Sequence, residues 1–169
     1  MLKHELYNYK LFIPTLPHLI NKIKQLTKNW KIQTIISDNI DINEKYYKNV
    51  FISVTCSGTA SLEISKRMIP QIVLYKLNPL TYFIFSFLTK IRFANIINIM
   101  NNKMIVKEIV NKELNKSKLI SAFSNIMNEK KFRDKQIFEV KKVLNQIQSS
   151  QDPFEICKKR IKEIISTTT

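Results

Sequence analysis

The sequence contains one glycine, two cysteines and two histidines in 169 residues. Neither cysteine belongs to a CxxC pair or a Cys/His cluster, so the spacing gives no support to a metal site. Isolated thiols of this kind are typical of a reducing, cytosolic setting. No apolar run reaches the ~18 residues that a membrane-spanning helix requires, and the first ten residues lack the apolar segment of a signal peptide.

Acidic residues are also scarce. The chain has 13 Asp and Glu and 28 Lys and Arg, which gives a net charge of +15. Such an excess favours an anionic partner, either a membrane surface or a nucleic acid. Lysine is nevertheless spread along the chain beside abundant isoleucine and asparagine, without the clustered stripe of a nucleic-acid binder, so compositional drift is the other interpretation. The length and the 44% hydrophobic content predict one folded domain with a real core.

The only glycine, Gly58, lies where a strand pattern changes to a helix pattern. Residues 51–55 are apolar and β-branched, as in a buried strand, and the following residues have helical character. A residue without a Cβ at this junction allows a ligand to approach the backbone, and the amino-terminal end of a helix favours a phosphate. The alternative is that Gly58 only relieves a tight turn.

Strand and helix patterns alternate over the first hundred residues. This alternation predicts an α/β fold in which helices flank a Rossmann-like parallel sheet. The predicted strands are 10–13, 31–37, 51–55, 71–75 and 93–97, and the predicted helices between them are 16–26, 43–47, 59–67 and 80–90.

The chain from residue 104 onward is predicted to be entirely helical. Its helices are expected at 117–128 and 129–148 and after Asp152-Pro153, where aspartate at the N-cap and proline at the first position mark a helix start. We therefore expect a partial nucleotide-sugar-binding domain at 1–114. The helices of 115–169 are expected to pack on it or on a partner.

One stretch carries a family resemblance. Residues 57–63, SGTASLE, followed by Ile69-Pro70 and by 79–82, PLTY, closely resemble the C-terminal domain of lipid-A-disaccharide synthase. Three further segments are similar to the family's: Leu11–Pro14 to a strand of the form fLIPa, Asn98 to the asparagine of PNLLA, and Val106–Val110 to a VxELL helix. The resemblance covers about residues 10–114.

The resemblance implies a glycosyltransferase of the GT-B type, with two facing Rossmann-like domains. Its C-terminal domain would bind the UDP part of a UDP-diacylglucosamine donor, whose acylated sugar is transferred to diacylglucosamine 1-phosphate in lipid A biosynthesis. The resemblance implies no cofactor and no metal. It also implies a cytoplasmic protein that is peripheral to the bacterial inner membrane.

The resemblance also assigns roles to five residues. Ser57, Gly58 and Thr59 would offer backbone and hydroxyl donors to phosphate, and Glu63 would accept hydrogen bonds from ribose hydroxyls. Asn98 would contact the donor from the end of a strand, where open α/β sheets bind ligands. For Glu63 the alternative is an acid that stabilises the helix dipole, and for Asn98 it is a loop cap.

The catalytic base is not identified, because the resemblance places it on an N-terminal domain that these residues do not match. The chain alone is therefore expected to be inactive, with a second chain or a homodimer as possible partners and no specific nucleic acid. The residues expected to face the membrane are Tyr82, Phe83, Phe87, Lys90 and Arg92. The alternative function is a non-catalytic basic protein that binds anionic membrane or nucleic acid.

Overall fold

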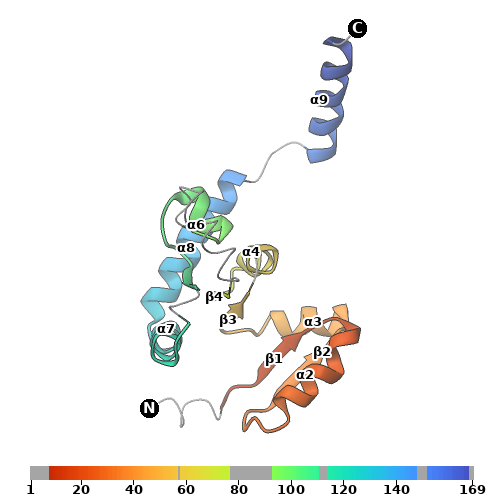
Figure 1. The fold of residues 1–169 in the computed structure, drawn as a ribbon. Coiled ribbons are helices and arrows are strands. Elements are labelled where there is room, and N and C mark those ends of the chain that lie inside the picture. The colour runs from red at the N-terminus through yellow and green to blue at the C-terminus, as the bar shows by residue number, and fades with distance from the viewer. Residues whose placement is uncertain (1–7, 57, 77–92, 111–113, 148–151, 168–169) are drawn as a thin grey trace.

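The computed structural model of the chain describes residues 8–56, 58–76, 93–110, 114–147 and 152–167, and Figure 1 shows their arrangement. The strands within these ranges are β1 (Leu11–Pro14), β2 (Thr34–Ser37), β3 (Ser53–Thr55), β4 (Gln71–Tyr75) and β5 (Lys107–Val110). The helices are η2 (Pro17–Leu19), α2 (Ile20–Thr27), α3 (Ile40–Tyr47), α4 (Gly58–Lys66), α6 (Ile96–Asn101), α7 (Lys116–Asn128), α8 (Lys130–Ile147) and α9 (Pro153–Thr167).

All strand pairs among the described residues are parallel, which confirms the predicted Rossmann-like α/β fold. The strands form two sheets, one of order β1-β2 and one of order β3-β4-β5. Leu11 is paired with Thr34 in the first sheet, and β4 lies between β3 and β5 in the second. Helix α2 lies between the paired strands β1 and β2 in the chain, and α4 lies between β3 and β4, as expected for crossover connections between parallel strands.

Helices cover both faces of the three-stranded sheet. Ile72 and Val73 are consecutive residues of β4, so their side chains point to opposite faces. Ile72 packs with Ile126 of α7 in one buried cluster, and Val73 packs with Val140 of α8 in the other. The first two helices of the C-terminal segment therefore form part of the core of this sheet, and the predicted domain boundary at residue 114 stays a prediction.

The last helix begins where the sequence predicts. The side chain of Asp152 accepts a hydrogen bond from the backbone N–H of Phe154 at 3.0 Å, as an N-cap does. Helix α9 extends away from the sheets and the other helices (Figure 1), and its large apolar side chains are exposed. Among the described helices, none combines the length and the apolar character that crossing a membrane would require.

Two sequence predictions are wrong, and they concern neighbouring segments. The predicted strand at 93–97 is instead the start of α6, because the side chain of Asn95 accepts a hydrogen bond from Ile97 N–H and caps the helix. The segment 106–110, expected to be helical, contains β5, which pairs with β4. The sheet thus gains its third strand from a segment whose short apolar pattern is compatible with either structure.

The buried carboxylate of Glu108 connects these two segments. It accepts hydrogen bonds from the backbone N–H groups of Ala94 at 2.8 Å and Asn95 at 3.0 Å, and from the side-chain amide of Asn98 at 2.7 Å. The amide of Asn95 in turn donates to the hydroxyl of Ser61 on α4. One carboxylate on β5 therefore determines where α6 begins, and Asn95 links it to α4.

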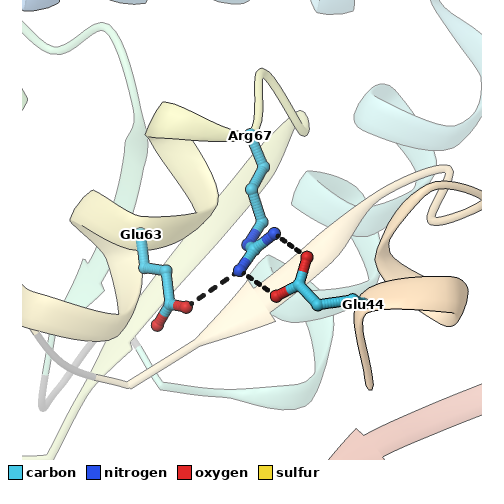
Figure 2. Close-up of polar contacts among 3 residues, drawn as sticks. All are labelled: Glu44, Glu63 and Arg67. Carbon is cyan, nitrogen blue, oxygen red and sulfur yellow. Dashed lines mark hydrogen bonds and ion pairs between the residues drawn. The ribbon is translucent and has the colours of Figure 1, made fainter. Parts of the chain in front are cut away.

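A separate contact joins the two sheets. Figure 2 shows Arg67, directly after α4, forming two hydrogen bonds of 2.7 and 2.6 Å with the carboxylate of Glu44 on α3. A third bond of 3.2 Å reaches Glu63 on α4, and the guanidinium lies 4.3 Å from the ring centroid of Tyr47. Because the Arg67–Glu44 pair is bidentate, it also fixes the orientation of α3 relative to α4.

We predict that Glu108→Ala lowers the free energy of unfolding by at least about 2 kcal/mol, because it leaves three donors without their acceptor in a buried site. Urea denaturation followed by circular dichroism measures the change. The control is Asp134→Ala, which removes an exposed acid from α8. Equal stability of the two variants would contradict this role of Glu108.

We also predict coupling between Glu44 and Arg67 that depends on pH. The hydrogen bond from Arg67 lowers the pKa of Glu44 below its ordinary value of 4.5. The pair should therefore stabilise the fold fully above pH 4.5, and this stabilisation should be lost as the pH falls through the lowered pKa. A double-mutant cycle with Glu44→Gln and Arg67→Ala should give non-additive unfolding free energies at pH 7 and additive ones in acid. Additivity at both pH values would show that the pair contributes nothing.

Candidate functional site

The candidate site is the amino-terminal end of α4, which follows directly from the carboxyl end of β3. Gln71 at the start of β4 holds the two elements together. Its side-chain oxygen accepts a bond of 3.2 Å from the hydroxyl of Thr55, and its amide donates to the Ser61 carbonyl at 2.9 Å and the Ser65 hydroxyl at 2.8 Å. All four residues are buried, so the start of α4 is supported by a polar cluster with fixed geometry.

A second glutamine, Gln136 of α8, fixes Gln71 from the other side. Its side-chain oxygen accepts from Gln71 N–H at 2.7 Å, and its amide donates to the Gln71 carbonyl at 3.1 Å. Backbone groups at the first residue of a strand are thus paired with a helix side chain. The connected hydrogen bonds of Gln136, Gln71 and Thr55 run from α8 through β4 to β3.

Gly58 is open to its surroundings. A Cβ added there would meet no atom of the described residues within 4 Å, and its φ angle is not positive. Neither close packing nor a left-handed backbone therefore requires a glycine, and the tight-turn interpretation loses its main physical reason. Access of a ligand to the backbone at Gly58 stays a prediction.

The first turn of α4 also lacks an acidic residue. Within the described residues, the partial positive charge of this helix end is therefore not offset by a carboxylate of the same turn. Thr59 follows Gly58 in this turn and is exposed. Ser57, the third residue predicted to contact phosphate, lies outside the described residues.

A hydroxyl near this helix end has no partner within the part of the chain that the structure describes. The phenolic oxygen of Tyr75, at the carboxyl end of β4, is buried and forms no hydrogen bond there. Burial raises the pKa of Tyr75, and the charges of Glu108 and Cys56 raise it further. Since Cys56 precedes Gly58 by two residues, the hydroxyl belongs to the same edge of the sheet as Gly58.

Glu63 is occupied by an interaction within the protein. It lies beyond the first turn of α4, so it is not the first-turn acid of the alternative interpretation. Its exposed carboxylate instead forms an ion pair of 3.2 Å with Arg67, one turn later on the same helix face (Figure 2). Contact with a ribose stays a prediction, and it would require Glu63 to share its oxygens with Arg67.

The side chain of Asn98 is fully buried and uses all its hydrogen-bonding groups. Its oxygen accepts from the N–H groups of Ile105 and Val106, both at 2.8 Å. Its amide donates to the Val106 carbonyl at 2.6 Å and to Glu108 at 2.7 Å. Asn98 therefore holds α6 against the start of β5, and direct contact with a ligand stays a prediction.

Asn102, the residue after α6, has a backbone conformation that is more typical of glycine. Asn102 has a φ of 47°, in the left-handed region that asparagine adopts more readily than most residues. Its backbone N–H donates to the carbonyl of Ile99 at 3.2 Å and closes the helix end. The loop geometry is thus possible without a small side chain.

The structure leaves some predictions open. The residues expected to face a membrane, Tyr82, Phe83, Phe87, Lys90 and Arg92, all lie outside the described residues. Among the described side chains, no group of three or more His, Cys, Asp or Glu is placed to hold a metal ion.

Sequence analysis missed two residues of this region, Gln71 and Tyr75. Gln71 is a polar residue that opens an otherwise apolar strand, and that exception was the available indication of a buried polar role. Tyr75 ends the same strand, and its sequence gives no indication that its hydroxyl is buried without a partner. Both lie on β4, which the sequence places correctly at 71–75.

Comparison with known proteins identifies the family to which this chain belongs. A profile of the lipid-A-disaccharide synthetase family matches residues 1–161. The lipid-A-disaccharide synthase of Rickettsia typhi is 28% identical, and the alignment covers 88% of this chain and 46% of that protein. The Rhodospirillum centenum synthase is 22% identical over 79% of this chain and 33% of its own length. The synthase of Persephonella marina is 32% identical over 61% of this chain and 28% of its own length.

The chain therefore spans less than half the length of these curated relatives. The family profile nevertheless covers all but the last eight residues, including the open helix start and the polar cluster that supports it. On this evidence the chain belongs to the lipid-A-disaccharide synthetase family.

Proposed function

We propose that this chain is the donor-binding part of a lipid-A-disaccharide synthase, and that the UDP group binds at the amino-terminal end of α4. The observation that carries this proposal is the open Gly58 at a helix end with no acid in its first turn. Backbone N–H groups at such an end donate to phosphate oxygens, and the helix dipole favours their negative charge. The family's name supports a sugar-transfer reaction.

The unpartnered hydroxyl of Tyr75 supports the same location. A buried hydroxyl without a hydrogen bond costs about 1–3 kcal/mol, so a ligand that provides an acceptor or a donor there binds more tightly. We propose that the hydroxyl contacts a polar group of the bound UDP. In this proposal the side chain of Asn98 contributes by holding α6 in place beside this edge of the sheet.

The reaction proposed for the complete enzyme is transfer of diacylglucosamine from UDP to diacylglucosamine 1-phosphate. An acceptor hydroxyl oxygen forms the new bond to the sugar and gives its proton to a base, while the bond between the sugar and UDP breaks and its electron pair leaves with UDP. The developing charge on the phosphate of UDP is stabilised by N–H donors. Transfer requires both substrates to be held together in one cleft. Since the chain spans less than half of its relatives, we propose that it needs a further polypeptide, from a second chain or a dimer, for activity.

Association with the inner membrane surface is the second part of the proposal. Helix α9 presents Phe154 and Ile161 on one face, 83% and 57% exposed, with Lys158 on the same side, and Lys159, Arg160 and Lys162 elsewhere on its surface. An amphipathic helix with basic residues binds anionic lipid headgroups while its apolar side enters the acyl boundary. The net charge of +15 adds a long-range attraction to the same surface.

We predict that the purified chain binds UDP and that Gly58→Ala and Tyr75→Phe each weaken binding at least tenfold in isothermal titration calorimetry. Neither change should destabilise the fold. The added Cβ meets open space, and the removed hydroxyl has no partner among the described residues. Thermal melting is the control for folding. Wild-type protein that is folded and does not bind millimolar UDP would contradict the donor site.

For the membrane surface, we predict that the pair Phe154→Ser and Ile161→Ser reduces binding to phosphatidylglycerol vesicles about tenfold, because two apolar side chains no longer enter the lipid. Co-sedimentation measures binding, with Ile40→Ser as the control because Ile40 is equally exposed on α3. Unchanged vesicle binding by the α9 variant would contradict the proposed role of α9 in membrane binding. Salt-sensitive retention of nucleic acid, with no vesicle binding, would favour the non-catalytic basic protein instead.

A further inference from the structure

A pocket lies beside β5, on the face of the three-stranded sheet that α7 covers. Its volume is about 400 Å³. Small-molecule sites in proteins have volumes of about 300–1,000 Å³, so this pocket has room for a compact organic ligand. The side chains that line it come from β5, from α7 and from the start of α8.

The pocket and α4 lie on opposite faces of the sheet. Ile109 of β5 lines the pocket and belongs to the buried cluster that contains Ile72 and Ile126. Leu62 of α4 packs instead against the cluster that contains Val73. Because Ile72 and Val73 point to opposite faces of β4, the sheet separates the pocket from the amino-terminal end of α4.

Helix α7 leaves this space open because of its side-chain sizes. One row of large apolar side chains packs in the cluster around Ile72, and it consists of Leu119, Phe123 and Ile126. The adjacent row lines the pocket and consists of Lys118, Ser121, Ala122 and Asn125, at the i, i+3, i+4 and i+7 spacing of one helix face. The short side chains of Ser121 and Ala122 do not fill the volume beside β5.

Part of the pocket wall is apolar. Ile109 is 1% exposed and contributes a surface that is already enclosed by the protein. Phe132, at the start of α8, is 36% exposed, so its ring still has accessible surface. An apolar group placed in the pocket would remove part of that surface from water, which favours binding.

The charged side chains of the pocket are both positive. Lys107 of β5 and Lys118 of α7 line it, and the described lining residues include no Asp or Glu. The ammonium of Lys107 lies 3.9 Å from the sulfur of Met104, which is a weak hydrogen-bond acceptor. An anionic ligand would offer Lys107 a much stronger, charge-assisted hydrogen bond.

We propose that this pocket binds a small organic anion with an apolar body, of the class of aryl phosphates and aryl carboxylates. The anionic group pairs with the ammonium groups of Lys107 and Lys118, and the apolar body packs against Ile109 and Phe132. The hydroxyl of Ser121 adds a hydrogen-bond donor for the ligand. This site lies beyond the proposed donor site and does not depend on it.

The test is a titration of the isotopically labelled full chain with phenyl phosphate, followed by amide chemical shifts in NMR spectra. We expect saturable shifts at Ile109, Ser121 and Asn125. Inorganic phosphate lacks the apolar body and benzyl alcohol lacks the charge, so each should bind at these residues about tenfold more weakly. Shifts at Gly58 report the donor site separately, so the two proposals can fail independently.

A matched pair of lysine variants separates the pocket from general attraction of anions. Lys107→Gln should weaken phenyl phosphate binding about tenfold, because the ligand loses a charge-assisted hydrogen bond. Lys103→Gln removes the same charge from an exposed residue outside the pocket lining and should leave binding unchanged.

A third variant fills the pocket. Ser121→Leu adds bulk at an exposed position of α7 and should abolish the saturable shift at Ile109. Thermal melting checks that each variant is folded.

Three results would overturn the proposal. They are the absence of saturable shifts at the lining residues, equally strong binding of inorganic phosphate or benzyl alcohol, and equal weakening by Lys107→Gln and Lys103→Gln. The first result would leave Lys107 as a charge that protects the outer edge of β5 from pairing with another strand. The last would show only nonspecific attraction by the net positive charge.

Discussion

The need to pair a buried carboxylate governs the arrangement of this protein around its candidate site. Glu108 has three N–H donors around it, two from the backbone before α6 and one from Asn98. An unpaired charge in that position would be strongly destabilising, so α6 and β5 form together or not at all. Asn95 extends the constraint to Ser61, and through it to the helix that begins at Gly58.

The polar cores on the two sides of α4 have complementary effects. The Glu108 cluster positions α6 relative to the sheet, and the Gln71–Gln136 cluster positions β4 relative to α8 and α4. The first combines one carboxylate with amide groups, and the second consists of amide and hydroxyl groups. The end of α4 between them is left with an open glycine and no first-turn acid. A helix end held by matched hydrogen bonds and without an acid in its first turn is compatible with the proposed anion site.

Local patterns were sufficient to predict most of the fold. The strand at 71–75 and the start of the last helix at Pro153 follow directly from apolar runs and capping residues. The segment 93–110 could not be predicted because its structure depends on Glu108, whose partners lie 10 to 14 residues away in sequence. A short run rich in Ile and Val is compatible with both a strand and a helix, and a contact of this kind determines which of the two forms.

The location of the candidate site stays a prediction, and the hydrogen bonds of its residues could not be predicted from the sequence. The unique glycine and the residues around it identified the start of α4. The contacts of Asn98 depend on Val106, which no local pattern connects to it. The Glu63–Arg67 ion pair has the i, i+4 spacing of a helix, and the sequence analysis did not use that spacing. Tyr75 was missed because a missing hydrogen bond is visible only in three dimensions. The exposure of Val54 likewise appears only once the two sheets are seen to be separate.

The central claim is that UDP binds at the amino-terminal end of α4. The most direct measurement is a titration of the isotopically labelled chain with UDP, followed by amide chemical shifts in NMR spectra. The account predicts saturable shifts at Gly58, Thr59 and Ala60, with small changes in α9. Shifts confined to lysine-rich surfaces, non-saturable and abolished by moderate salt, would contradict it and show only nonspecific attraction of an anion.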